Sequence, residues 1–310
     1  MEQPKHIPVL LNETLEALQI KQDGVYVDCT MGGAGHSSHI LQSCPQGYLY
    51  CFEQDEYAVE RGGAVLAATG QTNYTIIHDN FENLTNELNR YDAHKVDGFL
   101  YDLGVSSFQL DMGERGFSYN KEAPLDMRMD QSKPLTAFDI VNTYSEKELS
   151  RIFHLYGEED FAYNIARKIG EKRHLKPIET TTELAEIVIS AKPAKARRDG
   201  HPAKQVFQAL RIAVNRELDV FESSLKQALT HLNKGGRICV ITFHSLEDRI
   251  CMNIFKDACK TDVPSDLPIP DKDIKRDFKI INRKAIMASA EELAINPRSH
   301  SARLRILEKL

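Results

Sequence analysis

The sequence predicts an α/β fold in which a doubly wound, mostly parallel sheet is interrupted by a helical insertion. Three observations predict it. Short apolar runs alternate with amphipathic segments up to residue 103, the alternation stops between residues 105 and 204, and it then resumes. Strands that alternate with helices imply parallel crossover connections, and therefore a sheet with helices on both faces.

Four apolar runs bounded by turn residues predict the first half of the sheet. We expect strands at residues 25–29, 48–53, 74–78 and 96–103. Apolar residues at helical spacing predict helices at residues 9–20, about 57–68 and 84–88. A glycine-rich turn at residues 31–36 follows the first strand and leads into an amphipathic segment, which is the pattern of a strand, a tight loop and a helix N-terminus.

Between residues 105 and 204 no run has the pattern of a strand. Capping boxes at residues 145–148 and 180–183 predict two helix starts, and a further helix is expected near residues 161–172. We therefore expect a helical substrate-recognition insertion at residues 111–204. The sheet domain is then discontinuous, with residues 1–110 and 205–310.

The last third of the chain predicts the rest of the sheet. Residues 207–232 carry an apolar side chain every three or four positions, which predicts one long helix that ends before Gly235-Gly236. A fifth strand is expected at residues 237–242, followed by a helix capped at residues 245–248. A loop is expected at Pro264, Pro268 and Pro270, and a closing pair of strands at residues 278–281 and 302–307.

Composition limits the class of protein. The chain has 310 residues, of which 42% are hydrophobic and 27% charged, as in ordinary globular proteins. A net charge of −6 excludes a uniformly basic nucleic-acid binder but allows a local basic face. The six cysteines form no C-x-x-C pair, so neither a disulfide framework nor a metal site is expected. No apolar run is long enough to span a bilayer and residues 1–5 lack the features of a signal peptide, so a cytoplasmic protein is expected.

Four features follow strands at their carboxyl ends, where doubly wound sheets bind ligands. They are the loop at residues 31–36, Glu53, the segment ending at Phe81, and Asp102. Glu53 can accept hydrogen bonds from both hydroxyls of a ribose, and Phe81 can pack against an adenine. Taken singly, each has a structural alternative, since glycine turns often serve packing and an aromatic residue is often part of a core. Together they predict a site for an adenosine-containing cofactor.

The choice of cofactor rests on two further features. A dinucleotide fingerprint would need glycine at the position of Ser38, and no Walker lysine follows the loop. The turn at residues 232–237 and the closing strands resemble those of class I S-adenosylmethionine methyltransferases. An NAD-dependent oxidoreductase remains an alternative, as does a non-catalytic RNA-binding assembly factor that keeps the fold.

Several blocks of sequence are more specific. They are residues 29–37, 101–107, 114–119, 124–130, 206–212, 241–249, 296–298 and 301–305. In these blocks the chain resembles the bacterial 16S ribosomal RNA cytosine-N4 methyltransferases, the MraW family, from about His6 onward. The resemblance implies a Rossmann-like class I methyltransferase sheet and methylation of the N4 amine of a cytosine in the decoding region. That cytosine would already be modified on its ribose by a separate enzyme.

The resemblance also implies a set of site residues. S-adenosylmethionine would be bound by Gly33, Ala34, Gly35, His36, Glu53, Phe81, Asp102 and Gln109. The implied partner is 16S ribosomal RNA or the small ribosomal subunit. Two positions depart from the family: Glu53 stands where aspartate is usual, and Phe108 where proline is usual. Neither departure removes a necessary functional group.

Asp102 is the candidate catalytic residue, acting directly or through the backbone of residues 103–107. The N4 amine of cytosine is a poor nucleophile because its lone pair is delocalised into the ring, so an acceptor near its N–H groups would favour attack. Asp102 is followed by Leu103-Gly104-Val105 rather than by the D-P-P-Y-type motif of many amino-methyltransferases. The group that holds the base must therefore come from elsewhere, such as Phe108 or the insertion. The base itself must be splayed out to react, and His244 is interpreted as structural.

Two basic segments are candidates for contact with RNA. Residues 192–216 carry seven Lys or Arg and one acid, and Arg197, Arg198 and Lys204 are the expected phosphate contacts. A solvated face is the alternative. The second, weaker candidate contains Lys275, Arg276, Lys279, Arg283 and Lys284. The sequence leaves open the oligomeric state and whether free RNA or an assembled subunit is the substrate.

Overall fold

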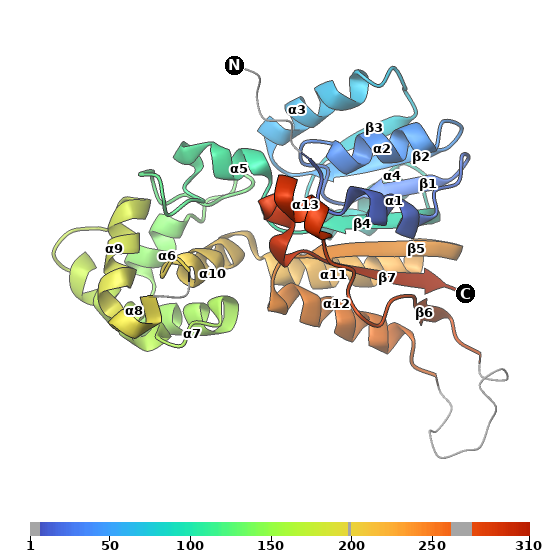
Figure 1. The fold of residues 1–310 in the computed structure, drawn as a ribbon. Coiled ribbons are helices and arrows are strands. Elements are labelled where there is room, and N and C mark those ends of the chain that lie inside the picture. Colours follow the sequence, from blue (N-terminus) through green and yellow to red (C-terminus); the bar gives the residue numbers. More distant parts are fainter. Residues whose placement is uncertain (1–6, 198–199, 262–274) are drawn as a thin grey trace, which may run out of the picture. The chain divides into compact units, whose positions relative to one another are not determined.

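The computed structural model describes residues 7–197, 200–261 and 275–310, and the chain divides into two compact units (Figure 1). The sheet unit comprises Met1–Gly104 and Leu218–Leu310, and the helical unit comprises Val105–Glu217. These divisions differ from the expected boundaries at 110/111 and 204/205. The helix α10 (Lys204–Asn215) belongs to the helical unit because its apolar face packs in the core of that unit.

The sheet has seven strands in the order β3-β2-β1-β4-β5-β7-β6. Their bounds are β1 (Val25–Asp28), β2 (Tyr48–Glu53), β3 (Tyr74–His78), β4 (Val96–Asp102), β5 (Leu232–Thr242), β6 (Phe278–Ile280) and β7 (Arg303–Lys309). The strands β1 to β5 are parallel, β7 is antiparallel to β5, and β6 is antiparallel to β7. This arrangement confirms the expected α/β, Rossmann-like fold class and the closing pair of strands.

Helices cover both faces of the sheet (Figure 1). One face packs against α1 (Leu11–Leu18), α2 (Gly35–Ser43) and α3 (Glu56–Ala67). The other packs against α4 (Leu84–Arg90), α11 (Glu217–His231) and α12 (Ser245–Ala258). The β4 strand contributes to both cores because its successive side chains alternate between the faces, Tyr101 toward one and Leu100 toward the other.

The register of the parallel strands brings their carboxyl ends to one edge. Asp28 pairs with Cys51 of β2 and with Leu100 of β4, and Asp102 pairs with Ile241 of β5. The ends of β1, β2 and β4 therefore lie side by side, with a carboxylate at each: Asp28, Glu53 and Asp102.

The helical unit is built around one apolar core. Its helices are α5 (Ser107–Asp111), α6 (Ala137–Thr143), α7 (Glu146–Gly157), α8 (Ala162–Arg173), α9 (Thr181–Ala191) and α10. The capping boxes predicted from the sequence are confirmed: Ser145 and Glu148 begin α7, and Thr180 and Glu183 begin α9. In each box, the N-cap hydroxyl and the glutamate side chain each accept a backbone N–H that the helix itself cannot satisfy.

The prediction of a single long helix at residues 207–232 is wrong, because two helices, α10 and α11, occupy this range. Arg216, with φ 53°, adopts the left-handed conformation and separates α10 from α11. The apolar spacing continues across the break because Phe207 and Leu210 pack in the helical unit, whereas Phe221 and Leu225 pack in the sheet unit.

Other expectations concern smaller features. All six cysteines are free thiols. The proline loop expected at Pro264, Pro268 and Pro270 lies outside the described residues. No helix in the described part of the chain is long and apolar enough to cross a membrane.

Candidate functional site

The glycine-rich loop connects the end of β1 to the start of α2. Gly32 and Ala34 have φ values of 49° and 57°, in the left-handed region, and the Ala34 amide donates to the Met31 carbonyl at 2.7 Å. Ala34 is fully buried. This tight turn leads from the end of β1 into the N-terminus of α2, at the carboxyl edge of the sheet. A helix N-terminus in this place favours a negatively charged ligand group.

Gly35 has a packing role. A Cβ atom at this position would lie 2.5 Å from Cγ of Pro8, so only glycine leaves room for the proline ring. The sequence suggests that the missing side chains let a ligand approach the backbone. At Gly35 the space is filled instead by the segment at residues 7–10, which we call the N-terminal strap.

The N-terminal strap is fastened on both sides. The Leu10 amide donates to Glu292 Oε1 at 2.9 Å, and Asn296 Nδ2 donates to the Ile7 carbonyl at 3.1 Å. Glu292 belongs to α13 (Ala290–Ile295), and Asn296 follows it. The carbonyl of Val9 accepts a hydrogen bond from His36 Nε2 at 2.9 Å. The strap therefore links the glycine loop to α13.

Asp28 is a buried carboxylate that sequence reasoning missed. It accepts hydrogen bonds from Ser37 Oγ at 2.6 Å and from the Thr30 amide at 3.0 Å. Burial raises its pKa, and these hydrogen bonds oppose the rise. Thr30 Oγ1 in turn accepts from the Asp102 amide at 2.7 Å. Asp28 and Thr30 thus fix the loop to the ends of β1 and β4.

Both carboxylate oxygens of Glu53 accept backbone amides, and one of these amides belongs to the glycine loop. Oε2 accepts the Gly32 amide at 2.8 Å, and Oε1 accepts the Asp55 amide at 2.9 Å. Burial raises the pKa of Glu53 to about 7, although both amides lower it. A carboxylate oxygen has a second lone pair, so both oxygens can still accept a hydroxyl. The glutamate side chain is thereby anchored on the loop through Oε2.

Asp102 lies at the end of β4 with its two oxygens in different surroundings. Oδ2 is 3.5 Å from His36 Nδ1, whereas Oδ1 is buried and has no hydrogen-bond partner among the described residues. Burial raises the pKa of Asp102 well above its ordinary value, and the charges of Asp28 and Glu247 raise it further. An oxygen that is buried and unsatisfied marks a place where a donor is missing.

Phe81 begins the short helix η1 (Phe81–Asn83) after β3. Its ring is partly buried and packs edge-on against Tyr101, with centroids 5.8 Å apart. Asn80 caps this turn, and its side-chain amide donates to Gln54 Oε1 at 2.7 Å. Phe81 is thus fixed beside β4 at the edge that carries Asp102.

The block at residues 241–249 supplies another carboxylate. The N-cap of α12 is His244, not Ser245 as expected, and its Nδ1 accepts the Glu247 amide at 3.4 Å. Glu247 Oε2 accepts the Phe243 amide at 2.8 Å, and Oε1 lies 3.0 Å from His244 Nε2. His244 and Glu247 are both nearly buried. The capping box therefore holds a carboxylate whose charge raises the pKa of Asp102.

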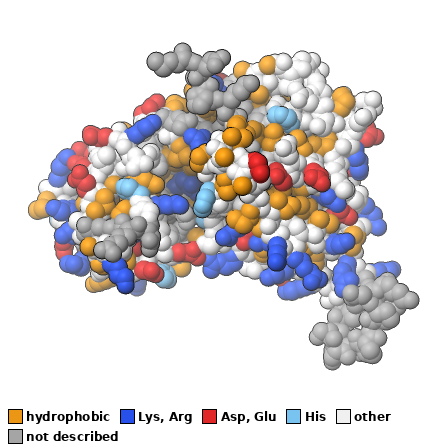
Figure 2. All heavy atoms as spheres, in the orientation of Figure 1, with side chains coloured by type: hydrophobic (Ala, Val, Ile, Leu, Met, Phe, Trp, Pro, Cys, Tyr) orange, Lys and Arg blue, Asp and Glu red, His pale blue; other side chains and the backbone are white. Residues whose placement is uncertain are grey.

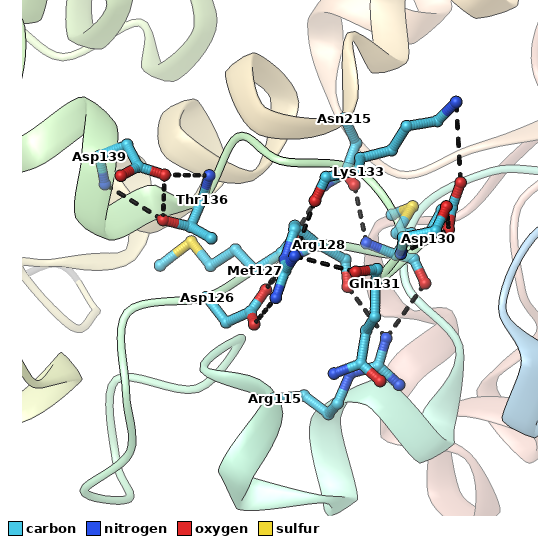
Figure 3. Close-up of polar contacts among 12 residues, drawn as sticks. Arg115, Asp126, Met127, Arg128, Asp130, Gln131, Lys133, Thr136, Asp139 and Asn215 are labelled. Carbon is cyan, nitrogen blue, oxygen red and sulfur yellow. Dashed lines mark hydrogen bonds and ion pairs between the residues drawn. The ribbon is translucent and has the colours of Figure 1, made fainter.

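In the helical unit, the block at residues 124–130 forms a loop that is held by hydrogen bonds (Figure 3). Arg128 binds Asp126 through two hydrogen bonds of 2.8 Å, and its Nη1 donates to the carbonyls of Gln131 and Lys133. Arg115 donates from the other side to the Arg128 carbonyl at 2.9 Å. Both guanidinium groups thus stabilise the loop backbone.

The same loop is tied to α10. Asn215 accepts from the Met129 amide at 2.8 Å and donates to the Met127 carbonyl at 2.8 Å (Figure 3). Met127 is buried and has φ 62°. These hydrogen bonds offset the cost of the left-handed conformation in a residue with a side chain.

Of the expected cofactor residues, Gln109 stands apart. The other seven belong to the sheet unit, whereas Gln109 belongs to the helical unit. Its Oε1 accepts the Ser106 amide at 3.1 Å in the capping box of α5, and its side chain is buried. Contact between Gln109 and a cofactor stays a prediction.

The first basic segment is less exposed than expected. Lys192 is buried, forms an ion pair with Glu159 at 2.5 Å and donates to the Pro202 carbonyl at 2.7 Å. It is therefore wrong to count Lys192 among residues that could contact phosphate.

The three expected phosphate contacts of this segment remain untested. Lys204 is exposed at the start of α10. Arg198 and the side chain of Arg197 lie outside the described residues.

Within the described ranges, no group of three or more His, Cys, Asp or Glu side chains is arranged to hold a metal ion.

The chain is similar to known methylases. The MraW methylase family matches residues 3–310. Two proteins called ribosomal RNA small subunit methyltransferase H, from Streptococcus dysgalactiae subsp. equisimilis and Streptococcus mutans, are each 53% identical, with 98% of both chains covered.

The chain also matches solved structures of methylases. An rRNA methylase from Streptococcus thermophilus has a TM-score of 0.43 at 13% identity, covering 100% of this chain and 98% of that chain. A methyltransferase from Streptococcus mutans in complex with SAH has a TM-score of 0.45 at 12% identity, covering 98% and 100%. The sequence relatives and the family match, rather than these TM-scores, carry the assignment of a family.

Proposed function

This chain belongs to the MraW methylase family, and from that premise we propose that it transfers a methyl group from S-adenosylmethionine to small-subunit ribosomal RNA. The names of the relatives that are 53% identical over 98% of the chain support this substrate. We propose further that the acceptor is the N4 amine of a cytosine in the decoding region. The single observation that carries the chemistry is the buried, unpartnered Oδ1 of Asp102.

The sheet unit has groups that fit S-adenosylmethionine. Both oxygens of Glu53 can accept ribose hydroxyls while the Gly32 and Asp55 amides hold the carboxylate in place. Phe81 would pack against the adenine, and the amides at the start of α2 would face the carboxylate of the methionine part. Bound there, the cofactor supplies an electrophilic methyl group, which it releases with the S–C bonding pair remaining on sulfur.

Asp102 would act on the amine. Its Oδ1 can accept a hydrogen bond from N4–H, which draws the nitrogen lone pair out of conjugation with the ring. As the N–C bond forms, the nitrogen becomes cationic and its proton must leave. A carboxylate whose pKa is raised by burial and by neighbouring acids accepts that proton more readily than an ordinary aspartate.

The test is methyl transfer from labelled S-adenosylmethionine to small subunits that lack the modification, followed by nucleoside analysis. We expect label in N4-methylated cytidine. Label in another nucleoside would overturn the N4 assignment, and no transfer to any RNA would overturn the function. Binding of NAD in a titration, without binding of S-adenosylmethionine, would instead support an oxidoreductase.

Asp102 is tested by substitution. D102N removes the anionic acceptor, and we expect transfer to fall at least a hundredfold, in the range typical of acid–base groups. D92N is the control because Asp92 is an exposed aspartate in the same unit. If D102N bound cofactor normally and transferred methyl groups at the wild-type rate, Asp102 would have no catalytic role.

A further inference from the structure

The edge of the sheet formed by β6 and β7 leads toward Asp102. Lys279 of β6 pairs with Glu308 near the far end of β7, and further on the Ile286 and Leu304 backbones pair with each other. Leu304 in turn pairs with Ile241 of β5, which also pairs with Asp102. Residues 278–286 therefore run along β7 toward the carboxyl edge of the parallel strands.

This segment is strongly basic although the whole chain has a net charge of −6. Between residues 275 and 284 there are five cations, all exposed, and one acid, Asp277. Lys279, Arg283 and Lys284 have no ion pair with any acid in the described ranges. Figure 2 shows Lys and Arg side chains gathered over the region of β6 and β7. Their charges are thus available to a partner.

Arg303 extends the charged surface to the carboxyl edge. It begins β7, pairs with Thr242 at the end of β5, and has a side chain that is 42% exposed. Its guanidinium lies 3.6 Å from Asp248, which also binds Arg305. Lys279 pairs with Glu308 of β7, and β7 covers ~17 Å from Glu308 to Arg303 at ~3.3 Å per residue. Two strand spacings of ~4.8 Å separate β7 from β4.

We propose that Lys279, Arg283, Lys284 and Arg303 form a phosphate track, which binds the backbone of a single-stranded RNA segment whose target base reaches Asp102. Lysine and arginine side chains spaced along an edge follow a phosphate backbone without reading its sequence. A track that ends two strands from Asp102 would hold the nucleotides that flank the reacting base. The identity of the RNA rests on the proposed function, whereas the binding of phosphates does not.

The test is charge reversal on the track. K279E/R283E/K284E is compared with R90E/K226E/K234E, which makes the same change in net charge at exposed positions on α4, α11 and the start of β5. A labelled single-stranded RNA of decoding-region sequence is titrated with each protein at several salt concentrations. Binding of S-adenosylhomocysteine checks that each variant is folded.

We expect the track variant to bind RNA at least tenfold more weakly, with a salt dependence of log K less steep by about 2, since each phosphate contact on a single strand contributes ~0.7. The control variant should behave as the wild type. Equal affinities and slopes for all three proteins would overturn the track. So would a loss of binding to assembled subunits without any change for the RNA alone, because the partner would then be a ribosomal protein. Neither result depends on methyl transfer.

Discussion

His36 Nδ1 lies 3.5 Å from Asp102 Oδ2, while the Nε2 atom of the same ring is bound to the Val9 carbonyl at 2.9 Å. A carbonyl oxygen only accepts, so Nε2 must carry a proton. A second proton can then reside on Nδ1 or on Asp102. With that proton on His36, the imidazolium stabilises the ionised carboxylate against the negative charges of Asp28 and Glu247.

Replacing His36 by glutamine tests this relationship. The amide of H36Q can still donate to the Val9 carbonyl, but nothing takes the place of Nδ1. Asp102 then titrates alone at its raised pKa, so the ionised form is reached only at higher pH. We expect the acid limb of the kcat–pH profile to move up by about one unit, with kcat at neutral pH reduced about tenfold.

The control for H36Q is H39Q, which makes the same change at an exposed histidine of α2. Carbon NMR of the Asp102 carboxyl group, assigned with D102N, follows the same titration without any activity. An unchanged Asp102 midpoint in H36Q would show that His36 does not position or charge-stabilise Asp102.

Glu53 should make the stability of the cofactor-free protein depend on pH. Its pKa is about 7 when folded and 4.5 when unfolded, so the folded state binds the proton more tightly. Stability should therefore fall as pH rises from about 4.5 to 7, by up to ~3 kcal/mol from this residue. Urea denaturation across this range measures the slope. Asp28 and Asp102 act in the same direction, so E53Q should flatten the slope only in part.

Bound cofactor should lower the pKa of Glu53, which burial raises in the cofactor-free protein. Ribose hydroxyls that donate to the ionised carboxylate lower its pKa. The carboxyl resonance of Glu53 should then titrate well below 7 in the presence of S-adenosylhomocysteine. A midpoint that does not change on binding would remove Glu53 from the ribose site.

Gly35 and Pro8 form a pair suited to a double-mutant cycle. G35A places a Cβ atom 2.5 Å from Cγ of Pro8 and should cost ~1–3 kcal/mol of stability, as overpacking does elsewhere. P8A removes the obstructing atom, so G35A/P8A should recover most of the loss. Urea denaturation of the four proteins gives the coupling. If the stability effects of G35A and P8A were additive, the N-terminal strap would move aside without losing stability.

Lys192 and Glu159 should be costly to separate. K192M leaves the Glu159 carboxylate buried without its cation, which should destabilise the helical unit by ~3–5 kcal/mol. The double variant K192M/E159L should be much closer to the wild type. K195M, at an exposed lysine nearby, should change stability by less than ~0.5 kcal/mol. A small effect of K192M would mean that water reaches the pair.

The strands could be predicted because a strand buried on both faces contains an apolar run, as at residues 48–52 and 99–101. The placement of Glu53 and Asp102 at one edge then followed from parallel connections. The break at Arg216 could not be predicted, since Val214 and Leu218 keep helical spacing and no glycine or proline intervenes. Packing in two separate cores decides that break.

The site was harder to predict where contacts join distant segments. Asp28 lies within the apolar run of β1, and its bond to Ser37 exists only once α2 has folded back. The burial of Lys192 could not be predicted from its neighbours in the sequence. Its partner, Glu159, belongs to another part of the helical unit.

The N-terminal strap has a consequence for biosynthesis. Residues 7–10 are fastened over the glycine loop by Glu292 and Asn296, which lie 282 and 289 positions further along the chain than their partners. The strands β7 and β6 also join the sheet only after most of the chain exists. A nascent chain can therefore fasten the N-terminal strap over the glycine loop only after residue 296 has been made.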